Sequence, residues 1–220
     1  ASFGDIFINE CFSTSHRNHS SIVGIPKYLP SFPGKLLETE VHNLKNLLSD
    51  NNSNKSVAVF GGSKISTKIK IIEYYANKFT KILVGGAMAN TFLQAMGIKI
   101  GSSIYEKSMI KIAREYIKNY DEKIMLPLDV IIISKKNEDL ALVKGVNEIL
   151  KDDIIMDIGP QTRMKFFDEI VTSDKLLWNG PLGLYEKKPF DAGTNFVMKA
   201  VKDNKSKNFF SIAGGGDTIS

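Results

Sequence analysis

The sequence has little of what membrane and secreted proteins usually carry. Its 220 residues include one cysteine, Cys11, so no disulfide bond can form within the chain, and this suits a reducing compartment. No apolar run reaches the length of a membrane span, and the run Val130–Ile133 has the length of a strand. The opening stretch ASFGDIFINE has no basic region before an apolar segment, as a signal peptide would. We therefore expect a cytoplasmic protein without a membrane partner.

Two familiar nucleotide-binding motifs are also absent. There is no G-x-x-x-x-G-K-[ST] segment, which excludes a P-loop protein, and no G-x-G-x-x-G after the first strand, which leaves a dinucleotide dehydrogenase unsupported. The formal net charge is +5, but the lysines are scattered and no nucleic-acid-binding motif accompanies them. A solvated lysine-rich surface explains most of this charge, and a positive field also favours small anions. We expect no nucleic-acid partner.

The pattern after residue 55 alternates between strands and helices. Because the strands are almost continuously apolar, this alternation predicts an α/β fold with a Rossmann-like parallel sheet and helices on both faces. The predicted strands are 56–60, 81–84, 123–133, 153–158, 175–179 and 209–213. The predicted helices are 65–79, 87–96, 107–120, 161–171 and 189–202.

The first fifty residues have a different pattern. Residues 5–12 resemble a strand, and a polar loop and three prolines then interrupt regular structure. Apolar residues at helical spacing predict a helix over Leu36–Leu48, followed by the linker-like run SDNNSNKS. We interpret residues 1–35 as the remnant of one lobe, 36–50 as a connecting helix and 51–220 as a second lobe.

Five of the predicted strands lead directly into glycine, in VAVFGGSK, ILVGGA, IIMDIGP, LLWNGPLG and FSIAGGGDT. One such glycine is explained by a tight chain reversal. Five are harder to explain in this way, because the carboxyl ends of parallel strands share one edge of the sheet, where ligands bind. Glycine also lets backbone N–H groups approach a ligand closely. The pattern therefore predicts a phosphorylated ligand.

The segment GGSKISTK adds two cations at this edge. It places Lys64 and Lys68 one helical turn apart at the expected start of a helix. An exposed lysine pair is usually a solvated surface feature, but after a strand and two glycines we favour a phosphate site. Ammonium groups beside helix-end amides suit a polyphosphate and the charge that develops during phosphoryl transfer.

Six segments carry a family resemblance over essentially the whole chain. TSHRNHSSIVG, GGSKISTK, VGGAMANTF, DIGPQT, WNGPLGLYE and GGGDT, in this order, resemble phosphoglycerate kinase. The resemblance implies a two-lobed glycolytic enzyme that moves a phosphoryl group reversibly between ATP and 3-phosphoglycerate with Mg²⁺, giving 1,3-bisphosphoglycerate and ADP. It also implies that the lobes close about a hinge.

The resemblance assigns roles to individual residues. Arg17 resembles the arginine that holds the phosphate of 3-phosphoglycerate, and a guanidinium suits that contact. Lys68 and the amides of Gly215 and Gly216 resemble the catalytic groups, and Asp217 resembles the acid on the side of Mg²⁺, the only metal contact expected here. The implied nucleotide-binding residues are Lys64, Lys68, Gly85, Gly86, Asn179, Pro181, Leu184, Glu186, Gly214, Gly215, Gly216, Asp217 and Thr218.

Some positions depart from the family pattern. Thr67 stands where an acid is usual, Ser63 replaces alanine, Asn90 replaces an aromatic residue, and Ile155 replaces a glycine and should narrow the adenine pocket. None of these changes removes a phosphate-contacting group. We assign Trp178 to the core beneath the nucleotide loop.

Members of the family are much longer than this sequence. We therefore expect an incomplete chain that is inactive by itself, cut from an enzyme that is a monomer at full length. The alternative is a non-catalytic module that binds nucleotides without transferring phosphate. The flanking coding sequence would separate these two interpretations.

Overall fold

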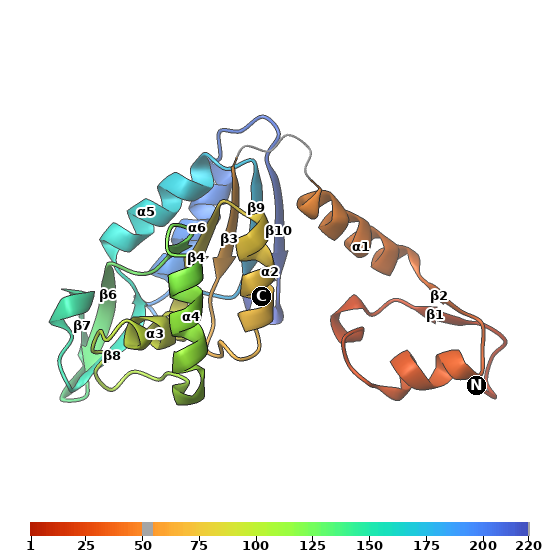
Figure 1. Cartoon of the computed structure of the whole chain (residues 1–220), viewed down its shortest axis with the longest axis horizontal. Helices are drawn as coiled ribbons and strands as arrows, with labels where there is room; N and C mark the ends of the chain where they lie inside the picture. The colour runs from red at the N-terminus through yellow and green to blue at the C-terminus, as the bar shows by residue number, and fades with distance from the viewer. Residues whose placement is uncertain (50–54, 220) are drawn as a thin grey trace. The chain divides into compact units, whose positions relative to one another are not determined.

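The computed structural model describes residues 1–49 and 55–219 and divides the chain into two units, Ala1–Asp50 and Asn51–Ser220 (Figure 1). Most of the linker-like run predicted after the first long helix, and the boundary at residue 50, lie outside the described residues. No helix in the described part of the chain is long and apolar enough to cross a membrane.

The first unit contains a parallel pair of short strands and one long helix. The strands are β1 (Phe7–Asn9) and β2 (Ser31–Pro33), and the helix is α1 (Lys35–Leu48), which confirms the predicted helix to within one residue. The carboxylate of Glu10 accepts hydrogen bonds from the backbone N–H groups of Leu36 and Leu37 at 3.0 and 3.2 Å. A carboxylate at this end satisfies free N–H groups and complements the helix dipole, so it fixes where α1 begins.

The second unit is built around a five-stranded parallel sheet with the order β10-β9-β3-β4-β5. The predicted α/β fold is confirmed here. Its strands are β3 (Ser56–Phe60), β4 (Lys81–Val84), β5 (Ile124–Met125), β9 (Lys175–Asn179) and β10 (Phe210–Gly214). Its helices are α2 (Ile69–Lys78), α3 (Gly86–Ala95), α4 (Ile110–Asn119), α5 (Pro160–Val171), α6 (Ala192–Lys202) and α7 (Gly216–Ile219).

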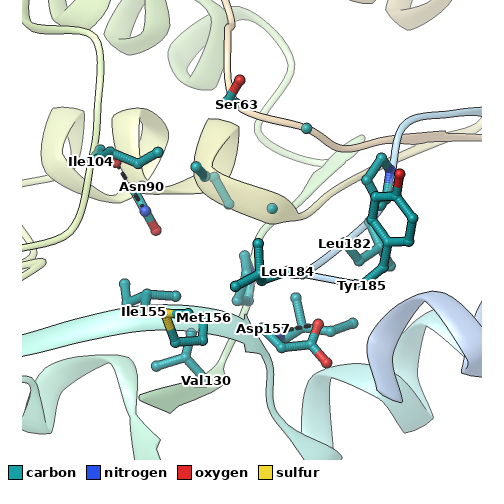
Figure 2. A pocket seen from close by; sticks show the side chains of 18 of the residues that line it. Ser63, Asn90, Ile104, Val130, Ile155, Met156, Asp157, Leu182, Leu184 and Tyr185 are labelled. Atoms are coloured by element: carbon teal, nitrogen blue, oxygen red, sulfur yellow. Dashed lines mark hydrogen bonds between the residues drawn. The ribbon is translucent and has the colours of Figure 1, made fainter. Parts of the chain in front are cut away.

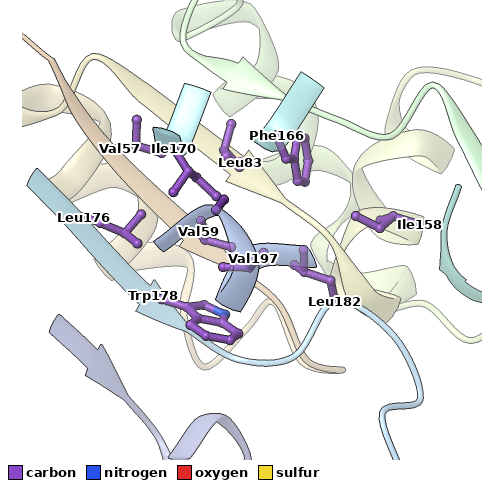
Figure 3. Close-up of a cluster of buried hydrophobic side chains, with 11 residues drawn as sticks. Val57, Val59, Leu83, Ile158, Phe166, Ile170, Leu176, Trp178, Leu182 and Val197 are labelled. Carbon is purple, nitrogen blue, oxygen red and sulfur yellow. The ribbon is translucent and has the colours of Figure 1, made fainter. Parts of the chain in front are cut away.

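Helices cover both faces of this sheet. Val57 and Val59 of β3 point to the face where Phe166 of α5 and Val197 of α6 complete a buried apolar cluster (Figure 3). The alternate residue Phe60 points the other way, and its ring lies 6.1 Å from the ring of Tyr75 on α2. Trp178 is buried in the first cluster, as predicted.

A second, antiparallel sheet was not predicted. It has the order β7-β6-β8 and consists of β6 (Asp129–Ser134), β7 (Asn137–Gly145) and β8 (Asp153–Ile158). The single strand predicted over residues 123–133 is wrong, because the chain leaves β5 before Pro127 and starts β6 after it. The prediction that five glycine-ended strands share one sheet edge is also wrong, because β8 belongs to this second sheet.

The chain direction across the parallel sheet changes at β3. From β3 the chain proceeds to β4 and β5 on one side, whereas β9 and β10 lie on the other side. The carboxyl ends of β3 and β9 therefore flank a topological switch point, the position where open α/β sheets bind ligands. The loops that follow β3 and β9 begin there, at Gly61 and Gly180.

Candidate functional site

Two cavities lie beside the switch point, and the first is mainly apolar. It has a volume of about 310 Å³ and lies between β6, β8, α3 and the loop after β9 (Figure 2). Val130, Ile155, Met156 and Leu184 supply aliphatic walls, and Tyr185 adds an aromatic ring. A slot of this size and character suits a flat organic group such as a nucleobase.

The second cavity is slightly smaller and more polar than the first. Its volume is about 290 Å³, and its walls are glycine-rich backbone with the side chains of Lys64 and Lys68. The backbone comes from the loops after β3, β9 and β10. Lysines beside exposed backbone N–H groups make a setting for an anion, and above all for a chain of phosphates. Its lining residues are Gly62, Ser63, Lys64, Thr67, Lys68, Asn179, Gly180, Pro181, Gly215, Gly216, Asp217 and Thr218.

The two cavities share part of their walls. Gly62, Ser63, Pro181 and Asp217 line both of them. A ligand with an apolar ring and a phosphate chain can therefore occupy both cavities at once. The exposed carboxylate of Asp217 lies at the junction, where such a ligand would change from ring to phosphate.

Glycine is required where these loops touch. Gly86 has a φ of +63°, and a Cβ there would lie 2.8 Å from the nitrogen of Gly62 and 3.0 Å from the oxygen of Pro181. A Cβ on Gly61 would collide with the same carbonyl oxygen of Pro181. The backbone atoms leave no room for a side chain, so glycine allows the β3, β4 and β9 loops to form a common wall.

Lys68 connects two of these loops. Its Nζ donates to the carbonyl oxygens of Gly61 at 2.9 Å and of Asn179 at 3.1 Å. Burial lowers the pKa of the Lys68 ammonium group, and the carboxylate of Asp217 acts in the opposite direction. The ammonium group is thus fixed at the switch point and lines the phosphate-sized cavity.

The loop that carries Lys64 is held from outside by Glu106. The Glu106 carboxylate accepts from the backbone N–H of Ser66 at 2.8 Å and from its hydroxyl at 2.6 Å. The carboxylate thus satisfies a free N–H group in the turn that precedes α2, which begins at Ile69 rather than at the predicted residue 65. Partial burial alone would raise the pKa of Glu106, but the hydrogen bonds from Ser66 and Ile65 and the charge of Lys64 lower it.

A second acid, Asp157 of β8, lies at the edge of the apolar cavity. It is 2% exposed, and its carboxylate accepts from the backbone N–H groups of Ile158 at 2.8 Å and Gly193 at 2.7 Å. Burial raises the pKa of Asp157 to about 7, against the opposing effect of these hydrogen bonds and of Arg163. Asp157 joins the cavity wall to the start of α6.

Most of the nucleotide-site residues named from the sequence lie around the two cavities. Gly86, Leu184 and Glu186 line the first cavity, whereas Gly85 and Gly214 line neither. The second cavity, or the wall common to both, contains Lys64, Lys68, Asn179, Pro181, Gly215, Gly216, Asp217 and Thr218.

Several of these positions have structural partners. Gly85 is buried, and a Cβ there would meet the side chain of Leu182, so it supports the wall from behind. The Thr218 hydroxyl accepts from the backbone N–H of Gly180 at 2.8 Å and fixes the glycine loop to the β9 loop. Thr67 donates to the carbonyl of Lys64 at 2.9 Å. Arg17 belongs to the first unit, where its side chain is exposed.

Sequence reasoning missed one residue of the apolar cavity, Asp157, and one that holds the Lys64 loop from outside, Glu106. Asp157 stands in the quoted segment DIGPQT but received no role, and Glu106 was not considered. An acid near the carboxyl end of an otherwise apolar strand is a usable signal for Asp157. The contact between Ser66 and Glu106, forty residues apart, leaves no local trace in the sequence.

Comparison with known proteins identifies the family. A family model described as phosphoglycerate kinase matches residues 1–220. The chain belongs to the phosphoglycerate kinase family. It is 39% identical over 226 residues to the phosphoglycerate kinase of Orientia tsutsugamushi, covering all of this chain and 56% of that protein. With that of Novosphingobium aromaticivorans the identity is 36% over 225 residues, covering all of this chain and 57% of the relative.

Solved phosphoglycerate kinase structures have the same fold. The structure from Coxiella burnetii superposes with a TM-score of 0.85 at 35% identity, over 98% of this chain and 56% of that one. The structure from Pyrococcus horikoshii gives a TM-score of 0.83 at 28% identity, over 98% and 55%. The chain thus spans little more than half the length of these phosphoglycerate kinases.

Proposed function

We propose that this chain supplies the nucleotide-binding part of a phosphoglycerate kinase, which transfers a phosphoryl group reversibly between ATP and 3-phosphoglycerate in glycolysis. The observation that carries the proposal is the junction of an apolar cavity with a lysine-lined, glycine-walled cavity at the switch point of the parallel sheet. The base of ATP or ADP would occupy the first cavity and its phosphates the second. Family membership supports the reaction class.

The chemistry at the phosphates is mainly electrostatic. Phosphoryl transfer needs in-line placement and neutralisation of charge more than a general base. Lys68, already fixed by two carbonyl groups, would contact the nucleotide phosphates, with Lys64 in support. The backbone N–H groups of Gly215 and Gly216 would meet the transferred phosphoryl group.

A magnesium ion fits this arrangement through Asp217. Among the described residues, no three His, Cys, Asp or Glu side chains gather where they could hold a metal ion by themselves. Mg²⁺ is commonly held by one or two carboxylates together with substrate phosphates, so the single carboxylate of Asp217 beside the phosphate-sized cavity suits it. When bound, the ion supplies positive charge to the phosphates.

The remaining assignments are part of the same proposal. Arg17 would hold the phosphate of 3-phosphoglycerate, residues 1–35 would belong to the lobe for that substrate, 36–50 to the connecting helix and 51–220 to the nucleotide lobe. We place the full-length enzyme in the cytoplasm as a monomer. Nucleic acid and membrane are not among its proposed partners.

Titration calorimetry with the 220-residue chain tests the proposal. We expect it to bind Mg·ADP and Mg·ATP and not NADH. NADH binding without ADP binding would instead favour a dehydrogenase. A lack of binding by a chain shown to be folded by circular dichroism would contradict the nucleotide assignment.

A further inference from the structure

One buried polar atom in the apolar cavity has no partner. Asn90 of α3 is 1% exposed and lines the cavity. Its Nδ2 donates to the carbonyl oxygen of Ile104 at 3.0 Å, but its Oδ1 accepts no hydrogen bond. Among the described residues, it is the sole buried side-chain nitrogen or oxygen in this condition. Buried polar atoms are almost always paired, so this atom requires an explanation.

The orientation of the Asn90 amide is fixed by its neighbour. A flipped amide would place Oδ1 against the carbonyl oxygen of Ile104, and two acceptors cannot share a hydrogen bond. The bond from Nδ2 to Ile104 therefore holds Oδ1 on the opposite side. Figure 2 shows Oδ1 directed away from Ile104, toward the side of the cavity where Ile155 lies. The cavity thus receives an acceptor and no donor from this side chain.

The lining side chains on the side of the cavity that Oδ1 faces offer no donor in return. The nearby lining side chains Val130, Ile155 and Met156 are aliphatic or a thioether, and none carries an N–H or O–H group. Oδ1 is also shielded from solvent, so bulk water does not satisfy it. A ligand that brings an N–H group to this side of the cavity would supply the missing donor.

We infer that Asn90 is a specificity-determining residue, which accepts a hydrogen bond from the exocyclic amino group of adenine. The inference rests on the proposed function, in which the base of ATP or ADP occupies this cavity. An acceptor buried among apolar side chains favours a base that brings an amino group. The same acceptor disfavours a base that offers no hydrogen-bond donor, and a base that places a second acceptor against Oδ1.

The wild-type chain provides a direct test. We expect calorimetry to give ADP an affinity about threefold to tenfold higher than that of purine riboside diphosphate, which lacks the amino group and is otherwise identical. Inosine diphosphate, which has an oxo group at this position, should bind at least as weakly as the deaminated analogue. Equal affinity for ADP and the deaminated analogue would overturn the inference.

A pair of variants separates recognition from packing. In Asn90→Leu, which preserves volume without the acceptor, the ratio of the two affinities should fall to about one. Thr91→Val is the matched control. The Thr91 hydroxyl accepts from the backbone N–H of Glu106 at 3.1 Å, so this substitution removes a hydrogen bond next to Asn90 but keeps the Oδ1 acceptor. This control should keep the wild-type ratio. An Asn90→Leu variant that weakens both ligands equally, with the ratio unchanged, would show a purely structural role.

These outcomes distinguish the inference from the proposed function. If ADP binds but no discrimination is seen, only the role of Asn90 fails. If ADP does not bind to the folded chain, the proposed function fails and the inference fails with it. If Asn90→Leu does not fold, the comparison of analogues on the wild-type chain still decides.

Discussion

The ammonium group of Lys68 donates to the main-chain carbonyl of Asn179, 3.1 Å away and 111 residues later in the chain. The same group donates to Gly61. One cation thus joins the ends of the two strands, β3 and β9, that flank the switch point of the sheet. The charge is fixed in place before any ligand binds, and such preorganisation makes electrostatic stabilisation effective.

Replacing this lysine should weaken nucleotide binding strongly. We expect Lys68→Ala to reduce the affinity for Mg·ATP by about 1.5–3 kcal/mol, because a charge-assisted phosphate contact is lost. Lys70→Ala is the control, since Lys70 is an exposed lysine of α2 that lines neither cavity. Calorimetry on folded variants checks this, and equal ATP affinity in Lys68→Ala and the wild type would remove Lys68 from the site.

The wall between the cavities should not tolerate a side chain at Gly86. Gly86 and Gly97 both have positive φ, +63° and +83°, but a Cβ on Gly97 meets nothing within 4 Å. Gly97→Ala should therefore cost only the left-handed backbone strain, roughly 1–2 kcal/mol. Gly86→Ala adds contacts with backbone atoms and should cost on the order of 1–3 kcal/mol more. Urea unfolding measures the free energy of unfolding of both variants. Equal losses of stability would mean that the loops around Gly86 move apart without cost.

The sequence predicted the parallel sheet well because its strands are nearly continuous apolar runs. The run 56–60 is buried at every residue, as central strands of a covered sheet are. The same reasoning failed for 153–158. An apolar run carries no mark of parallel or antiparallel pairing. The run 153–158 pairs antiparallel with 129–134, and the outer strand of the same sheet, 137–145, is mostly exposed and polar at its start. Pairing depends on the partner, which local pattern does not reveal.

The glycines and lysines of the site could be predicted from the sequence, because the requirements for backbone approach and for positive charge restrict the residue type at these positions. The unpaired Oδ1 of Asn90 could not be predicted in this way. The residue type at position 90 departs from the family pattern, but the lack of a partner for Oδ1 depends on Ile104 and on the apolar wall. Burial and pairing arise only when distant segments pack together.

The contact between Glu106 and Ser66 should make stability depend on acid pH. The folded pKa of Glu106 is lowered, so its contribution is present above the unfolded value near 4.5 and is lost as the pH falls through the folded pKa. The stability gap between the wild type and Glu106→Gln should be about 1 kcal/mol near neutral pH and shrink below about pH 4. Thermal unfolding across this range checks it, with the exposed Glu115→Gln as control. A gap that does not change with pH would contradict the ionic contact.

Asp157 should give the stability a pH dependence of the opposite sign. Its folded pKa, about 7, exceeds the ordinary aspartate value of 3.8, so its contribution to stability is fully present below about pH 4 and is lost as the pH rises through 7. Over this interval the free energy of unfolding of the wild type should fall by on the order of 2–4 kcal/mol relative to that of Asp157→Asn. At higher pH the difference should not grow further. Urea unfolding between about pH 4 and pH 8 measures this. The exposed Asp139→Asn should follow the wild type. Parallel curves for wild type and Asp157→Asn would rule out a proton on Asp157.

The 220-residue chain should bind nucleotide without completing the reaction. Transfer requires two anionic substrates held in line, and such placement can supply ~7–11 kcal/mol of the barrier. Of the residues that would hold 3-phosphoglycerate, the resemblance assigns only Arg17 within this chain, which spans 55–57% of its relatives. We therefore expect no ATP-dependent formation of 1,3-bisphosphoglycerate in an assay that couples this product to a dehydrogenase. A full-length phosphoglycerate kinase added to the same mixture should restore the signal and so verify the assay. Turnover by the chain comparable to that of the full-length enzyme would show that the acid substrate is held by groups that we have not recognised.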